Sequence, residues 1–589
     1  MLLSPRARWL SLIGLVAVAI SIALLVPSQP SIVQIIVPRP AATATAVPPA
    51  AVYSEAIVGK PRDINPLLSD FNDADQDLTA LVFSGLTTND VNGEARPALA
   101  QSWEISEDGL NYTFALRRDV RWHDGVPFNS RDISATVALL QATEFPASPA
   151  LTDFWRRVNI ATPGDYTVTF TLSEPFAPFL SYTSLGILPA HIVEKIPASL
   201  WPDRNFNAHP IGTGAYRITT IDEGHSVITL QPFADYYGQK PRIGQIDLHF
   251  YANESAALAA YKRGEVLGIS HVGTALLPDA RRQEDLALYA APMSGFDALY
   301  LNLTNPLFQQ KEVRQALLLA LDRQRIIDRS LDGQGLVPDS PLLPDNWAYN
   351  RYVRKYSLDT LAAKTLFAQA GWTLNDQDGT LHKGDQKMDF AIMASDDPDQ
   401  VRVIEEITRQ WSVIGVKAHP QVTGFSGLAR DFLRPRKYDT IFVRWRDPSS
   451  DPDLYALWHS TRISDEGQNY GGWQNRDADE MLEQGRRDAD PKRRADLYAK
   501  FQDLFADQVP ALLISYPIYV YAVDRRVQNV QIGPLARPAD RFRTIANWTI
   551  DVPADAGSPT TLPGATPQSA TTPQAVTTLK PVTAPQPTP

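Results

Sequence analysis

Hydrophobic and polar residues alternate along several short segments of the chain. Residues 111–117 and 165–172 place an apolar side chain at every second position, which is the pattern of a β-strand with one buried face. Residues 227–230 and 246–250 are rich in β-branched and aromatic residues and are therefore predicted to form two further strands.

Other segments carry the longer period of a helix. Residues 311–321 and 401–411 repeat apolar side chains every three or four positions. Residues 358–370 are also expected to be helical, with Gly371 as the stop at the carboxyl end. Strands and helices are mixed without the regular alternation of a TIM barrel, and we find no internal repeat. The pattern predicts an α/β fold (mixed α+β).

The amino-terminal segment has the character of a membrane anchor. A mostly apolar run over residues 9–26 follows Arg6 and Arg8, and no charge comes after it until Arg39. Its length suits one spanning helix, and the positive-inside rule places the rest of the chain outside the membrane. The Ala-x-Ala pattern at residues 44–46 lies far beyond this run, so we expect residues 1–26 to remain as an uncleaved anchor rather than a removed signal segment.

The length of 589 residues exceeds what one hydrophobic core usually serves, so at least two lobes are expected. Residues 27–51 are rich in Pro, Ala and Thr and are predicted to be a tether. Residues 553–589 have too few large apolar side chains to order themselves and are predicted to be a disordered Pro/Thr-rich tail. The folded body is therefore expected over residues 52–552.

Composition excludes several classes of function. The formal net charge of −11, without a long basic run, argues against a nucleic-acid partner. The chain has no cysteine, so it has no disulfide framework, no thiolate nucleophile and no lipobox, and it is not a lipoprotein. None of the nine histidines is spaced three or four residues from another, so no local metal-binding motif exists. We predict no metal and no cofactor.

Motifs for catalysis are also lacking. Residues 212–214 read Gly-Thr-Gly, without the third glycine of a dinucleotide fingerprint or the lysine of a P-loop, and predict a tight loop between strands. Residues 375–379 predict a hairpin turn rather than a calcium loop. Residues 122–125, Trp-His-Asp-Gly, predict a turn with structural hydrogen bonds. No Gly-x-Ser-x-Gly elbow is present, and we predict that the protein is not an enzyme.

A series of short blocks between Gly59 and Pro510 carries more specific information than any single motif. These blocks are residues 59–68, 82–90, 96–114, 116–128, 210–217, 302–308, 313–317, 320–323, 369–372, 469–473, 477–481 and 490–498. In these blocks, and in this order, the chain resembles the extracellular solute-binding proteins of ABC importers (family 5), whose members include oligopeptide-, dipeptide- and nickel-binding proteins.

The resemblance implies a two-lobed clamp of the periplasmic-binding-protein kind with a discontinuous first lobe. Lobe I would comprise residues 52–291 and a return segment, 516–552, and lobe II residues 292–515. The chain would cross between the lobes near Pro292 and near Ser515. A ligand bound between the lobes stabilises the closed form by hinge motion, and the permease distinguishes the closed form from the open form.

The resemblance also implies that residues 438–453 line the ligand cleft. Peptide binders of the family use an Asp three residues after the Trp to pair with the α-amino group of the ligand, since an unpaired buried ammonium is costly. Here Pro448 stands at that position and Asp447 comes one residue earlier. The candidate ligand-binding residues are Trp445, which could stack on the ligand; Arg444 and Arg446, on the other face of the strand, which could pair a carboxylate; Asp447; Asp451; Asn469; Tyr470; and Trp473.

The function that the resemblance implies is capture of short peptides outside the plasma membrane, at the periplasmic or cell-surface side. The partners would be an ABC permease with its ATPase subunits, and the membrane itself through the amino-terminal helix; we expect a monomer. Nickel chelates, oligosaccharides or another solute are alternative ligands, because the fold hosts many. A membrane-anchored solute sensor and an extracytoplasmic hydrolase are the alternatives from other functional classes.

Overall fold

The computed structural model of the protein describes residues 51–551 except residues 91, 223, 225, 447, 448, 450, 465 and 466. The predicted anchor (1–26), nearly all of the tether and the tail (553–589) lie outside the described residues. Of the helices that are described, none has both the length and the apolar character needed to cross a membrane.

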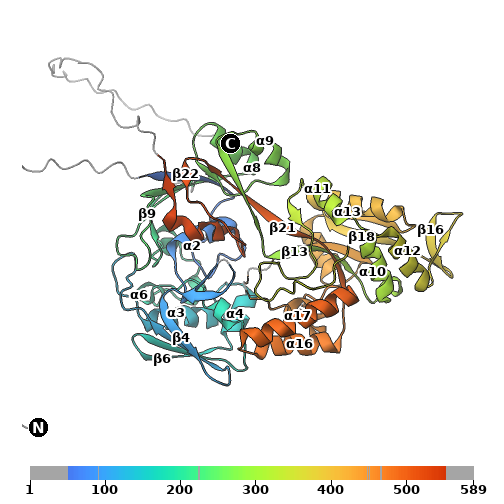
Figure 1. Cartoon of the computed structure of the whole chain (residues 1–589). Coiled ribbons are helices and arrows are strands. Elements are labelled where there is room, and N and C mark those ends of the chain that lie inside the picture. Colours follow the sequence, from blue (N-terminus) through green and yellow to red (C-terminus); the bar gives the residue numbers. More distant parts are fainter. Residues whose placement is uncertain are drawn as a thin grey trace, which may run out of the picture. The chain divides into compact units, whose positions relative to one another are not determined.

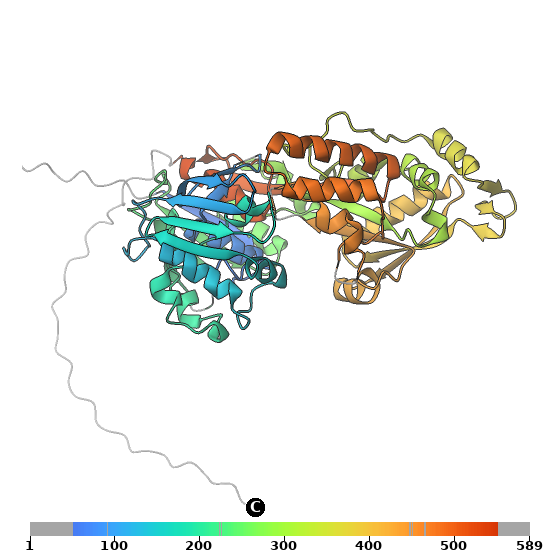
Figure 2. The same ribbon diagram turned by 90° about the horizontal axis from the view of Figure 1, so that it is seen from below.

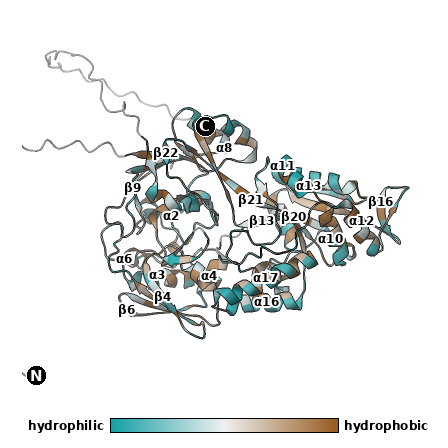
Figure 3. Cartoon of the chain, in the orientation of Figure 1, coloured by the Kyte–Doolittle hydropathy of each residue, from teal (hydrophilic) through white to brown (hydrophobic). Residues whose placement is uncertain are grey.

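One long sheet runs through the described residues (Figure 1). The order of its strands is β19 (Lys417–Thr423), β18 (Asp389–Ser395), β20 (Thr440–Arg446), β13 (Gly295–Leu301), β21 (Ala511–Asp524), β11 (Gly268–Ile269), β1 (Val52–Val58), β10 (Gln245–Tyr251), β9 (Val227–Pro232) and β8 (Tyr216–Ile221), with β12 (Leu286–Pro292) and β14 (Gly335–Leu336) also paired to β21. In β21, 13 of the 14 residues are buried. A strand that is buried on both faces is mostly hydrophobic, and Figure 3 shows hydrophobic colour along it.

Separate hydrophobic cores lie along the two halves of β21. We call residues 51–292 with 518–551 lobe I, and residues 295–516 lobe II. Lobe I has two core clusters, which take side chains from β1 to β12 and from the second half of β21 onward. Lobe II has two others, which lie on opposite faces of the strands β13, β18 and β20. No cluster among the described residues draws buried side chains from both lobes.

Helices cover the sheet in both lobes. Lobe I has α2 (Asp73–Val82), α3 (Ser130–Gln141), α4 (Pro149–Trp155), α5 (Phe179–Tyr182), α6 (Ala190–Val193), α7 (Arg204–Ala208), α8 (Glu254–Lys262), α9 (Leu277–Arg281) and the 3₁₀ helix η6 (Pro538–Asn547). Lobe II has α10 (Lys311–Leu319), α11 (Arg323–Ser330), α12 (Thr360–Gln369), α13 (Pro398–Ser412), α15 (Tyr455–Trp458), α16 (Arg476–Arg487) and α17 (Pro491–Gln508).

Lobe I also carries a separate antiparallel sheet. Its order is β4 (Ala100–Ile105), β5 (Asn111–Leu116), β7 (Thr167–Thr171) and β6 (Asn159–Gly164). Figure 2 shows these blue and cyan strands together, and α3 packs against β6 and β7. On β5 the alternating residues Tyr112, Phe114 and Leu116 are buried, which confirms the half-buried strand predicted from the pattern.

The remaining pattern-based predictions of secondary structure are confirmed, with shifted ends. Strands β7, β9 and β10 and helices α10 and α12 lie where they were expected. Gly371 follows α12 with φ +86°, the left-handed conformation that ends helices. Helix α13 begins three residues earlier than its apolar pattern, because the Asp397 side chain caps it by accepting the Gln400 N–H at 3.0 Å.

The chain passes between the lobes on three neighbouring strand segments. Residue Asp297 of β13 pairs with Ser515 of β21, and Pro292 of β12 pairs with Ile518 of the same strand. Gly295 begins β13 with φ +124°, and a Cβ there would lie 2.2 Å from the Trp445 carbonyl oxygen. Only glycine permits both this backbone and this close approach.

The two glycines of the Gly-Thr-Gly motif are packing positions. The motif forms a loop, as predicted. The element before it is helix α7, where a strand was expected, and the element after it is strand β8. A Cβ at Gly212 would lie 1.9 Å from the Val82 carbonyl oxygen, and one at Gly214 would lie 2.4 Å from that of Leu81. The loop therefore rests directly on the carboxyl end of α2.

The Trp-His-Asp-Gly motif is the turn that was predicted, and it holds this glycine loop. The Gly125 N–H donates to Trp122 O at 2.8 Å. Nδ1 of His123 accepts the Gly212 N–H at 3.3 Å, and Nε2 donates to Gly214 O at 3.0 Å. Since one ring nitrogen accepts and the other donates, His123 is the neutral Nε2–H tautomer.

His123 gives the stability of lobe I a defined dependence on pH. Burial lowers the pKa of His123 from 6.5 to about 4. Between these pH values His123 is protonated in the unfolded chain but neutral in the folded protein. The free energy of unfolding should therefore fall as the pH is lowered from 6.5 to 4. The expected loss from this group is about 2–3 kcal/mol.

The measurement is urea denaturation of the parent and His123→Gln at pH 4, 5, 6 and 7. The difference between parent and variant should shrink towards acid pH, because glutamine does not titrate. His419→Gln, at an exposed histidine of β19 that pairs with Asp389, controls for the loss of a surface histidine. A constant difference across the range would contradict the assignment.

Candidate functional site

Strand β20 ends beside β13, one of the strand segments on which the chain passes between the lobes. Its last residues pair with β13 as Arg444 with Asp297, Trp445 with Phe296 and Arg446 with Gly295. Because neighbouring residues of a strand face opposite sides, the two arginines share one face of the sheet and Trp445 lies on the other. This alternation is as the sequence predicts.

Trp445 packs against the core of lobe II. Its half-buried side chain adjoins the cluster that contains Phe296 and Tyr300, together with the half-buried Tyr455. The ring is thus held on one side by apolar packing and retains part of its surface exposed. That leaves Trp445 able to stack on a ligand, although the ring also has a packing role.

Arg444 and Arg446 face carboxylates of the chain itself. Arg446 Nη1 lies 3.2 Å from Oδ1 of the buried Asp297, and Oδ2 of the same carboxylate accepts the Ser515 hydroxyl at 2.8 Å. Arg444 lies 3.4 Å from Asp397 and 3.6 Å from Asp399, at the amino end of α13. The arginine face therefore carries its own counter-charges, and a ligand carboxylate would have to compete with them.

The acidic residues that follow β20 differ in their surroundings. Asp447 lies outside the described residues. Asp451 accepts two hydrogen bonds from Arg494 of α17, at 2.6 and 2.8 Å, and the two side chains are only 10% and 6% exposed. Burial alone would lower the pKa of Arg494, but the Asp451 carboxylate raises it above its ordinary value. Asp451 is thereby committed to an internal ion pair.

Asn469, Tyr470 and Trp473 are held mainly by internal contacts. The Asn469 side chain is fully buried; it donates to the carbonyl oxygens of Trp458, His459 and Trp473 and accepts the Trp473 N–H. The Trp473 ring is buried against Phe501 and Phe505. Tyr470 is half-buried, edge-on to Tyr300 at 5.6 Å. In this conformation the geometry gives no support for a ligand contact by Asn469 or Trp473.

One cluster near these residues was missed by sequence reasoning. Asp453 lies 3.0 Å from Arg486 of α16, and burial raises the pKa of Asp453 while Arg486 opposes the rise. The Arg486 guanidinium lies over the rings of Tyr455 and Phe176. Asp453 falls within the segment that resembles the family's cleft, but nothing in the sequence indicates its partners, which are far away along the chain.

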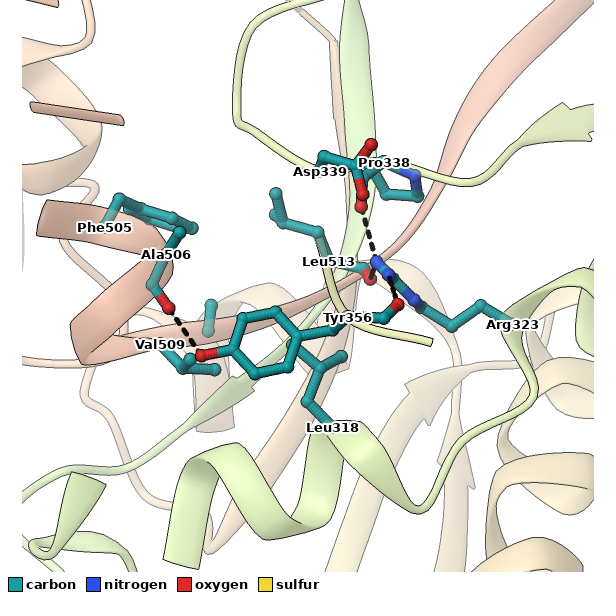
Figure 4. Close-up of a pocket in the computed structure, with 10 residues that line it drawn as sticks. Leu318, Arg323, Pro338, Asp339, Tyr356, Phe505, Ala506, Val509 and Leu513 are labelled. Carbon is teal, nitrogen blue, oxygen red and sulfur yellow. Dashed lines mark hydrogen bonds between the residues drawn. The ribbon is translucent and has the colours of Figure 1, made fainter. Parts of the chain in front are cut away.

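Two hollows in the described residues do not include any of the seven candidate residues that the structure describes. One, between α17, β21 and Tyr356, measures about 20 Å³ and is far too small for a peptide (Figure 4). There Arg323 donates to the carbonyl oxygens of Pro338, Leu513 and Tyr356. The other is a surface groove of about 310 Å³ between α3 and α6. The described residues also contain no cluster of three or more His, Cys, Asp or Glu suited to a metal ion.

Comparison with known proteins places the chain among transport receptors. Residues 94–465 match the bacterial extracellular solute-binding proteins, family 5 (middle region). The oligopeptide-binding protein AppA of Bacillus subtilis is 27% identical over 81% of this chain and 88% of its own. The dipeptide-binding protein of Escherichia coli is 27% identical over 75% of this chain and 85% of its own.

Solved structures agree with the fold. NikZ of Campylobacter jejuni, determined in complex with Ni(L-His), superposes with a TM-score of 0.68 at 26% identity, covering 85% of this chain and all of NikZ. HbpA2 of Haemophilus parasuis gives a TM-score of 0.74 at 22% identity, with 85% and 100% covered. Such proteins share the mixed α/β, two-lobed architecture of periplasmic binding proteins.

Proposed function

Because the chain belongs to the bacterial extracellular solute-binding proteins of family 5, we propose that it is the extracytoplasmic solute-binding component of an ABC transporter. It captures short peptides between its lobes and delivers them to a membrane permease that works with an ATPase. The observation that carries this proposal is the family match over residues 94–465, supported by peptide-binding relatives that cover most of the folded body. It binds and releases its ligand without chemical conversion.

The proposed clamp divides at the strands that connect the lobes. Lobe I and lobe II are the parts of the chain defined above, and their bounds differ by a few residues from the crossings expected near Pro292 and Ser515. The separate cores along the two halves of β21 support this division. Gly295 and the paired residues Asp297 and Ser515 lie where the hinge would bend. Ligand shifts the equilibrium towards the closed form because it contacts both lobes only there.

The proposed peptide site is the end of β20. Asp447 is the carboxylate proposed for the peptide's α-amino group, because Asp451 is already paired with Arg494. Trp445 would stack on a ligand side chain or peptide plane. Arg444 and Arg446 would take the ligand's carboxylate only by exchanging partners with Asp297 and Asp397.

The proposed location is the outer face of the plasma membrane. The apolar run at residues 9–26 would anchor the protein, and residues 27–51 would tether it. A tethered monomer raises its local concentration near the permease without a new contact. The anchor, the monomeric state and the uncleaved amino terminus rest on the sequence alone.

The experiment is a thermal-shift screen of the full chain in detergent. Di- to pentapeptides are compared with nickel–histidine and with oligosaccharides. A ligand at a hundred times its dissociation constant should stabilise the protein by about 2.7 kcal/mol. We expect peptides to do so, and Asp447→Asn to weaken the shift.

The control is Asp477→Asn, an exposed carboxylate on α16, which should leave the shift as in the parent. Stabilisation by nickel–histidine or by a sugar, with no effect of any peptide, would refute the proposal that the ligand is a peptide. It would still be consistent with a two-lobed solute-binding protein. The absence of any shift with all three classes would count against a solute-import role and favour a receptor for a different kind of ligand.

A further inference from the structure

The segment after the proposed peptide site is fastened to two helices by ion pairs. Within residues 451–458, Asp451 pairs with Arg494 of α17 and Asp453 pairs with Arg486 of α16. The Tyr455 ring lies 4.3 Å from the Arg486 guanidinium carbon, measured to the ring centre. The position of this segment therefore depends on the two arginines.

Arg486 also contacts lobe I. Its guanidinium carbon lies 4.9 Å from the centre of the Phe176 ring, and its carbonyl oxygen accepts the Ala177 N–H at 2.7 Å. The cation is thus shared between an aromatic ring of lobe I and an aromatic ring and a carboxylate of lobe II. A cation stacked on aromatic faces away from bulk water is held more strongly than one at an open surface.

The lobe I side of this contact is well supported. Phe176 packs against Phe154 at 5.5 Å and Tyr182 at 5.9 Å, and those two rings stack at 4.0 Å. The Tyr112 hydroxyl donates to the Phe176 carbonyl oxygen at 3.2 Å. Because neighbouring rings and a hydrogen bond fix Phe176, movement of lobe I is transmitted to its contact with Arg486.

We propose that Arg486 is a positioning residue that couples the approach of the lobes to the order of residues 451–458. When Phe176 and Ala177 dock, they hold Arg486 in the orientation that fixes Asp453 and Tyr455. When the lobes separate, Arg486 loses its lobe I contacts and the segment loosens. This inference rests on the proposed function for its biological meaning, since it makes the ligand-proximal segment respond to closure.

The test is hydrogen–deuterium exchange of the full chain in detergent, without added ligand. Phe176→Leu removes the aromatic face that Arg486 contacts and changes no residue of lobe II. It should raise the exchange rate of amides in residues 451–458 several-fold, and Arg486→Ala should do so at least as strongly. Arg486→Lys keeps the charge near Asp453 but loses the planar stack. Its exchange rate in residues 451–458 should lie between those of the parent and of Arg486→Ala.

The matched control is Arg487→Ala, which removes the same charge from the next, exposed position of α16. It should leave exchange in residues 451–458 at the parental rate. Unchanged exchange there in Phe176→Leu would overturn the coupling, and so would an equal rise in Arg487→Ala. Phe176→Leu should keep parental exchange in α10, so a general loss of folding is distinguished from the local effect. No ligand is needed, so failure of the peptide proposal would show separately, in the thermal-shift screen.

Discussion

Replacing Arg541 by methionine is expected to lower the free energy of unfolding of lobe I by about 3–5 kcal/mol. Arg541 is fully buried and donates to Glu55 at 2.6 and 2.9 Å and to Asp77 at 2.5 and 2.7 Å. Glu55 also accepts the hydroxyls of Tyr53 and Tyr521. Methionine fills most of the volume but leaves two buried carboxylates without a counter-ion.

This network fastens the return segment of the chain to its beginning. It joins η6 to β1, α2 and β21, which are separated by up to 486 positions in sequence. The loss should be measured by urea denaturation followed by circular dichroism. It should shrink at acid pH, because protonation removes the charge of the stranded carboxylates.

Arg543→Met is the matched control on the same helix. Arg543 pairs with the partly exposed Asp540. Its replacement should lower the free energy of unfolding by less than about 1 kcal/mol. Adding Glu55→Gln and Asp77→Asn to Arg541→Met should recover part of the loss. If Arg541→Met costs no more than Arg543→Met, the buried network contributes nothing net to stability.

The corresponding prediction in lobe II is that Arg314→Leu lowers the free energy of unfolding by about 3 kcal/mol or more. Arg314 of α10 donates to the carbonyl oxygens of Gln508 and Val509, at the end of α17, and of Phe308 and Gln309. Burial lowers the pKa of Arg314 to about 10, so it stays charged at neutral pH. Leucine leaves these four carbonyls without their donor.

Denaturation in urea again provides the measurement, with Arg329→Leu as the control. Arg329 is exposed on the neighbouring helix α11, and its replacement should change stability by less than about 0.5 kcal/mol. Arg314→Lys should be intermediate, because an ammonium cannot reach all four oxygens. Equal effects of Arg314→Leu and Arg329→Leu would show that the carbonyls find other donors.

Local patterns predicted the elements of the fold better than its connections. The alternation of β5 and the helical period of α13 follow from each residue's own preference for a buried or exposed face, which short stretches of sequence display. The ordered blocks predicted the family and with it the two lobes. The start of α13 was misplaced because its cap, Asp397, precedes the apolar pattern.

Partners that lie far apart in sequence were not predictable. Asp451 and Arg494 are 43 positions apart, and His123 and Gly214 are 91 apart. No local spacing indicates which carboxylate a buried arginine will meet. Asn469 and Trp473 belong to a recognisable block, but the block does not distinguish a residue that supports the loop from one that lines the cleft.

Closure of the lobes on a peptide can be measured directly by double electron–electron resonance between two spin labels. The chain has no cysteine, so Ser173→Cys in lobe I and Lys500→Cys in lobe II, both exposed, provide two unique spin-label sites. We expect the distribution of distances between the labels to be shorter and narrower with a mixture of di- to pentapeptides than without it. If peptides raise the melting temperature of the protein but leave the distance distribution unchanged, the ligand binds without closing the lobes, and closure is contradicted.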